Sequence, residues 1–91
     1  MKLIPFSLLR EMAEAKLIFE LVAERRPNGQ GYMLIARTRK GDHVLTATRS
    51  PGPRHFKSLD TLINETDKLG IRNVTVVSFD PRLVSLRRST P

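Results

Sequence analysis

Apolar and polar residues alternate through the segment Lys16–Glu24, where every second residue is apolar: Leu17, Phe19, Leu21 and Ala23. A period of two predicts a β-strand with one buried face. The preceding residues 8–15 carry apolar side chains at helical spacing behind Ser7, a candidate capping residue, and they predict a short helix. Because every residue over 8–24 tolerates a helix, one continuous helix is the alternative.

A hairpin turn follows this predicted strand. The sequence Pro27-Asn28-Gly29 suits such a turn, because Asn and Gly accept positive φ. The chain would return as a second strand over Tyr32–Thr38, in a register with three diagnostic pairs: Leu21 opposite Ala36, Ala23 opposite Leu34, and Glu20 opposite Arg37. This register gives one apolar face and places an ion pair on the other face.

A second turn at Arg39-Lys40-Gly41-Asp42 predicts a third antiparallel strand over His43–Arg49, with Leu34 beside Ala47 and Ala36 beside Leu45. The inner face of this meander would then consist of Leu17, Phe19, Leu21, Ala23, Tyr32, Leu34, Ala36, Leu45 and Ala47. The outer face mixes charged residues with five apolar ones: Ile18, Val22, Met33, Ile35 and Val44. These five are too many to leave in water, so the first helix or a second copy of the chain should cover them.

The remaining elements follow a turn at Ser50-Pro51-Gly52-Pro53 that ends the third strand. Ser58 is a candidate N-cap of a second helix, with Asp60 in the first turn, where the helix dipole favours an acid. Gly70 would end this helix in the left-handed conformation. The last strand, Asn73–Phe79, is almost wholly apolar, which predicts a central position in the sheet or burial on both faces.

These elements predict an α+β fold in the order α-β-β-β-α-β: a short N-terminal helix, a three-stranded antiparallel meander, a helix and a final strand. Residues 1–81 would form a single domain, followed by a basic and mobile C-terminal tail over 82–91. The chain has no cysteine, which excludes disulfides and fits a reducing cytoplasm. No apolar run approaches the ~20 residues of a membrane span.

The positive charge is concentrated in one part of the chain. Between Arg25 and Lys57 there are eight Arg or Lys residues and one acid, Asp42, and this segment accounts for the whole formal net charge of +7. A local field of one sign attracts polyanions, of which nucleic acid is the commonest. Aromatic residues are sparse here, so contact with the phosphate backbone is favoured over stacking of bases.

Catalytic chemistry has little support. The only histidines are His43 and His55, neither at helical spacing from another ligand, so we expect no metal, cofactor or catalytic site. A small ribonuclease is the enzymatic alternative, because a histidine near cations can act on a scissile phosphate. The stretch Lys40-Gly41-Asp42-His43 is similar to the Gly-Ser-His stretch of HicA-type messenger-RNA interferase toxins. Here Asp42 replaces the serine and would repel a phosphate.

Between His43 and Val77 the chain carries a further pattern: Leu45 to Arg49, Pro53-Arg54-His55-Phe56, Ser58-Leu59-Asp60, Leu69-Gly70-Ile71 and Val74-Thr75-Val76-Val77. It resembles small plasmid-borne bacterial proteins of the ParC-like partition or maintenance type. The resemblance implies a non-enzymatic accessory factor without catalytic residues. The chain departs from that family at Ser50-Pro51-Gly52-Pro53, where the family has a shorter basic-glycine turn.

We therefore expect a non-enzymatic, cytoplasmic nucleic-acid-binding or plasmid-maintenance accessory protein, with DNA favoured over RNA and with a possible homodimer. Its phosphate contacts would be Arg37, Arg39, Lys40, Arg49, Arg54 and Lys57. Two alternatives remain: a protein–protein interaction module of a partition or toxin–antitoxin complex, whose basic hairpin binds an acidic partner, and a ribonuclease toxin that uses His43.

Overall fold

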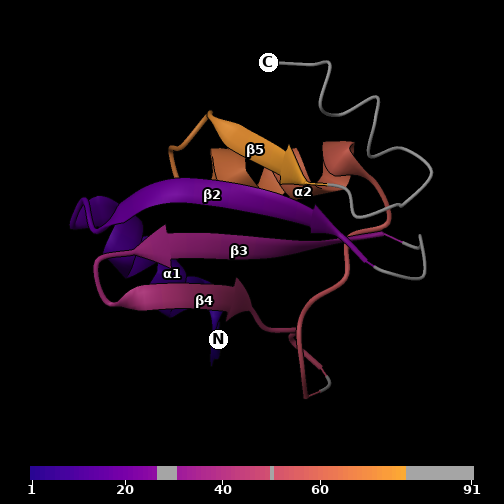
Figure 1. Cartoon of the computed structure of the whole chain (residues 1–91), viewed down its shortest axis with the longest axis horizontal. Coiled ribbons are helices and arrows are strands. Elements are labelled where there is room, and N and C mark those ends of the chain that lie inside the picture. Colours follow the sequence, from indigo (N-terminus) through magenta and orange to yellow (C-terminus); the bar gives the residue numbers. More distant parts are fainter. Residues whose placement is uncertain (27–30, 50, 78–91) are drawn as a thin grey trace.

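The computed structural model describes residues 1–26, 31–49 and 51–77 (Figure 1). Its elements are β1 (Lys2–Ile4), α1 (Phe6–Glu14), β2 (Ile18–Arg25), β3 (Tyr32–Thr38), β4 (Gly41–Leu45), α2 (Leu59–Asp67) and β5 (Val74–Val77). The five strands form one mixed sheet in the order β1-β4-β3-β2-β5. The predicted α+β class is confirmed, and the sheet gains a strand, β1, that the sequence pattern did not indicate.

The topology explains why one face of the sheet carries both helices. Strand β1 is parallel to β4 and β5 is parallel to β2, while β3 is antiparallel to both of its neighbours. Helix α1 therefore joins the parallel strands β1 and β2, and α2 joins β4 and β5, in the same direction along the sheet. Such crossovers are almost always right-handed, which puts both helices on the same face. Figure 1 shows both helices behind the sheet.

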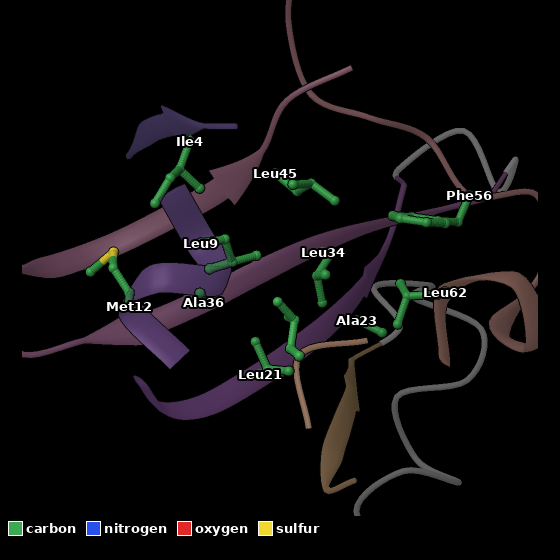
Figure 2. Packing of buried hydrophobic residues seen from close by; sticks show 11 residues of the cluster. Ile4, Leu9, Met12, Leu21, Ala23, Leu34, Ala36, Leu45, Phe56 and Leu62 are labelled. Carbon is green, nitrogen blue, oxygen red and sulfur yellow. The ribbon is translucent and has the colours of Figure 1, made fainter. Parts of the chain in front are cut away.

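The main core lies between that face and the two helices. The sheet contributes Leu21, Ala23, Leu34, Ala36 and Leu45, all of them buried and all on the predicted inner face. Helix α1 covers one half of this surface with Leu9 and Met12, and α2 covers the other half with Leu62, next to Phe56 (Figure 2). Aliphatic side chains from both layers thus fill the space between them.

The predicted register of the first hairpin is confirmed, because Leu21 pairs with Ala36 and Glu20 with Arg37. One inner-face assignment is wrong. The register shifts between Ile18 and Glu20, and this β-bulge reverses the alternation at the start of β2. As a result Phe19 is 68% exposed, while Ile18, which was assigned to the outer face, packs against the main core.

The switch from helix to strand occurs at Lys16, as predicted. Lys16 has a φ of 61°, its N–H donates to Ala13 O at 3.1 Å, and Leu17 N–H donates to Met12 O at 3.0 Å. This pair of bonds is a Schellman motif, which ends a helix by reversing the backbone. The alternative of one continuous helix over 8–24 is therefore wrong.

The start of α1 also differs from expectation. The helix begins at Phe6 behind Pro5, and no side chain caps it, so Ser7 is not the N-cap. Proline fixes φ but offers no side-chain acceptor, and it separates β1 from the helix within one residue. The prediction for α2 is confirmed: Ser58 Oγ accepts from Thr61 N–H at 3.3 Å, and Gly70 has a φ of 76°.

The second hairpin has a different register from the predicted one. Ala36 pairs with His43 rather than Leu45, because the turn holds only two residues and Thr38 pairs directly with Gly41. The Thr38 hydroxyl supports this tight turn by donating to Gly41 O at 2.8 Å and accepting from Lys40 N–H at 3.0 Å. The shift is two residues, so each side chain stays on its predicted face.

Two predicted strands end elsewhere. Strand β4 stops at Leu45 instead of Arg49, because the chain turns back on itself after Thr46.

Strand β5 is an edge strand paired only with β2, with Val76 47% exposed, so the prediction of a central or doubly buried strand is wrong. The parallel crossover through α2 delivers β5 to the outside of β2, while β3 occupies the centre. Part of the predicted last strand, and the tail 82–91, lies outside the described residues.

A smaller apolar cluster lies on the helix-free face. Val22, Ile35 and Val44 are buried there, and Met33 and Val77 pack against them. The first helix does not cover these residues, since it packs on the opposite face. A homodimer that covers them stays a prediction, which light scattering at high concentration would refute by giving the mass of one chain. Neither helix in the described part of the chain is long and apolar enough to cross a membrane.

Candidate nucleic-acid interface

The structure places five of the six predicted phosphate contacts at two opposite ends of the sheet, while Arg37 lies within β3. Arg39 and Lys40 form the β3–β4 turn, which we call the turn end. Arg49, Arg54 and Lys57 belong to residues 46–49 and 51–57, which we call the loop end and which pair with the start of β3 through Phe56. The seven residues of β3 separate the two ends by roughly 20 Å at ~3.3 Å per residue. The predicted single basic hairpin is therefore two separate basic sites in the structure.

Backbone hydrogen bonds hold the loop end in place. Ala47 N–H donates to Gly52 O at 3.0 Å, and Arg54 N–H donates to Leu45 O at 2.8 Å. Tyr32 and Phe56 then exchange two hydrogen bonds of 2.8 Å, which attach the segment to the start of β3. These bonds restrain the backbone from which the basic side chains of the loop end project.

Gly31 permits this attachment. Its φ is +85°, and a Cβ at this position would lie 2.6 Å from Phe56 O. Any side chain would therefore push the segment away from β3. Gly31 directly precedes the predicted second strand, and its contact with a residue 25 positions later has no local sequence signal.

Arg54 is the most constrained basic side chain at the loop end. Its guanidinium lies over the ring of Phe56, 4.6 Å from the centroid, and Phe56 itself is buried. Arg54 Nη1 also donates to Glu65 Oε2 at 3.1 Å, and Lys68 Nζ bonds the other carboxylate oxygen at 3.0 Å. Arg54 therefore shares one carboxylate with Lys68, which leaves the three groups with a net charge of +1, and its guanidinium is held over an aromatic ring.

His55 contacts Arg26, a cation that is not among the six predicted phosphate contacts. Arg26 Nη1 lies 3.1 Å from His55 Nδ1. A guanidinium can only donate, so Nδ1 accepts and neutral His55 carries its proton on Nε2. Arg26 lies just after β2, and its own N–H donates to Gly31 O at 3.0 Å. Arg26 is next to the predicted turn, which is the one feature of the sequence that could have marked it. Its contact with His55 depends on the fold, because the two residues are far apart in the sequence.

Two shallow pockets adjoin at His55. One, of about 460 Å³, is lined by Ala47, Thr48, Arg49, Pro51, Pro53, Arg54 and His55. The other, of about 270 Å³, is lined by Arg26, Gly31, His55, Phe56 and Lys57. Among the described residues no Asp or Glu lines either pocket. The loop end is therefore hollowed, rich in donors and without a carboxylate on its walls.

The other predicted contacts lie in less favourable surroundings for an anion. Arg37 pairs with Glu20 at 3.4 Å across β2 and β3, and Thr75 of β5 donates to the same carboxylate at 2.9 Å. At the turn end, Lys40 lines a pocket with Lys2, but Asp42 lies in the same wall. Arg37 and Lys40 therefore each have a carboxylate nearby.

The ribonuclease alternative needs groups that converge on one phosphate, and the two histidines do not converge. His43 is part of β4 at the turn end, beside Lys2 and Ala36, while His55 lies at the loop end. The buried Nδ1 of His43 has no hydrogen-bond partner among the described residues. Within the same residues no three His, Asp or Glu side chains are grouped to hold a metal ion.

Comparison with known proteins gives no relative: no family model, curated protein or solved structure matches the chain. The resemblance to ParC-like partition proteins stays a prediction.

Proposed function

We propose that this protein is a non-enzymatic nucleic-acid-binding protein whose loop end contacts the phosphate backbone. The observation that supports this is the convergence of Arg26, Arg49, His55 and Lys57 on two adjoining pockets whose described walls hold no acid. Phosphate oxygens only accept hydrogen bonds, and every one of these four side chains can donate. The accessory role in plasmid maintenance is part of the same proposal, with DNA favoured over RNA.

The strength of the contact follows from the cations available. Within the described part of the chain, Arg49 and Lys57 make no ion pair, whereas Arg54 and Arg37 are paired with Glu65 and Glu20. With Arg26 added, about three to four phosphates are neutralised, which implies a slope of roughly −3 to −4 for log affinity against log salt on duplex DNA. Binding should therefore weaken steeply as salt rises.

The test compares two double variants that remove the same charge from opposite ends. Arg49→Gln with Lys57→Gln should flatten the slope by about 2 and weaken binding alike across sequences. Arg39→Gln with Lys40→Gln is the matched control and should change the slope by less than about 0.5. Exposed changes of this kind cost little stability, about 0.5 kcal/mol or less, so both variants should fold.

The opposite result, a slope lowered only by the variant at the turn end, would place the interface there. If the unmodified protein binds no nucleic acid even at low salt, the proposal fails. In that case an acidic protein partner becomes the better explanation for the basic loop end.

A further inference from the structure

The guanidinium of Arg54 offers a flat surface beside the phosphate contacts. One of its faces lies on the Phe56 ring at 4.6 Å, and its edge is held by Glu65 at 3.1 Å. The side chain is nevertheless 33% exposed and lines the pocket of about 460 Å³. Because Phe56 lies against one side of the guanidinium and Glu65 binds Nη1, a planar ligand in this pocket would approach Arg54 from the side away from Phe56.

We propose that this pocket takes an unpaired nucleobase, stacked on Arg54, and that the natural ligand is therefore single-stranded nucleic acid. This inference rests on the proposed function and specifies its ligand. Unstacked bases of single strands stack on guanidinium planes as well as on aromatic rings. In a duplex the bases are stacked on one another and have no free face to offer.

The charge arrangement around Arg54 supports a stacking role over a phosphate contact. Glu65 already accepts a hydrogen bond from the guanidinium, so Arg54 has less to gain from a phosphate than Arg49 or Lys57, which have no ion-pair partner among the described residues. Its planar surface is what remains for a ligand. Arg49 lines the same pocket, and His55 joins it to the neighbouring pocket that holds Lys57, so phosphates flanking the bound base would meet cations on both sides.

The pocket is shallow, but it has room for one nucleobase. Its volume lies within the ~300–1,000 Å³ typical of such pockets. Pro51 and Pro53 contribute apolar surface, and Thr48 contributes a hydroxyl. This mixture suits a heteroaromatic ring that has apolar faces and a polar edge. The scarcity of aromatic residues in the basic segment predicted backbone contact without stacking, but a guanidinium plane is also a stacking surface.

Three probes of equal length separate a base contact from a phosphate contact: a single-stranded oligonucleotide, the same strand with abasic sites, and the corresponding duplex. At one low salt concentration, the unmodified protein should bind the single strand about tenfold more tightly than the abasic strand, as expected for one stacked base. Deoxyribose and ribose versions of the single strand distinguish DNA from RNA as the source of the base.

Arg54→Lys is the decisive variant, because it keeps the positive charge near Glu65 but removes the plane. It should lower affinity for the single strand about fivefold to tenfold and leave affinity for the abasic strand within about twofold. Urea denaturation shows whether the variant is folded. If it is not, the comparison of intact and abasic strands with the unmodified protein decides alone.

Equal affinity for intact and abasic strands overturns the stacking inference while leaving phosphate contact standing. An equal loss of affinity for both strands in Arg54→Lys overturns it too, because Arg54 would then act through its charge. No binding to any of the three probes overturns the proposed function together with this inference.

Discussion

Replacing Gly31 by Ala tests how the loop end is attached to the sheet. A Cβ on Gly31 would lie 2.6 Å from Phe56 O, a distance that real Cβ atoms do not tolerate. The obstacle is the backbone of Phe56, so relief requires this part of the loop end to move away from β3. That movement would break one or both of the 2.8 Å hydrogen bonds between Tyr32 and Phe56.

The loss of stability expected for Gly31→Ala has two parts. The left-handed backbone at φ +85° costs a residue with a Cβ about 1 kcal/mol relative to glycine. Two lost or unsatisfied backbone hydrogen bonds add about 1 kcal/mol each. With one or both bonds lost, the free energy of unfolding should therefore fall by about 2–3 kcal/mol, a large share of the ~5–15 kcal/mol typical of a small domain.

Gly70→Ala is the matched control, because Gly70 has a similar φ of +76° but no neighbouring atom within 4 Å of the position that a Cβ would take. It should lose only the backbone part, about 1 kcal/mol. Urea denaturation monitored by circular dichroism measures both variants. Equal losses for the two variants would refute the close approach of Gly31 to Phe56 and with it the rigid loop end.

Two further changes test the helix ends. Lys16→Gly should raise the free energy of unfolding by about 0.5–1 kcal/mol, because Lys16 ends α1 at a φ of 61°, where glycine is unstrained. A loss of stability in thermal melts would contradict the Schellman motif at Lys16. Ser58→Ala should lower the free energy of unfolding by about 1 kcal/mol, because it removes the acceptor of Thr61 N–H. Ser7→Ala should change the midpoint of urea denaturation little, because Ser7 does not cap α1. Equal effects of the two serine changes would show that the cap of α2 contributes nothing.

Local patterns in the sequence were sufficient for much of the fold. The alternation over 16–24 and the turn at Asn28-Gly29 specified the pairing of Leu21 with Ala36, because register follows from side-chain faces and turn length. Ser58 and Gly70 marked the ends of α2 through capping chemistry that acts over a few residues.

The failures share a non-local cause. Strand β1 has only three residues, and it becomes a strand because β4 lies beside it, which no local pattern records. The bulge at Phe19 and the edge position of β5 also depend on which strands are neighbours. The basic segment appeared continuous in sequence, yet β3 separates its two ends, and the contact between Arg26 and His55 joins residues 29 positions apart.

The most direct test of the central claim, that the loop end binds nucleic acid, is an NMR titration of the labelled protein with a short single-stranded oligonucleotide at low salt. The account predicts that the largest amide and side-chain shifts fall on Arg26, Arg49, Arg54, His55 and Lys57, with little change at Arg39 and Lys40. Shifts centred on the turn end, or no shifts at any ratio of oligonucleotide to protein, would contradict it.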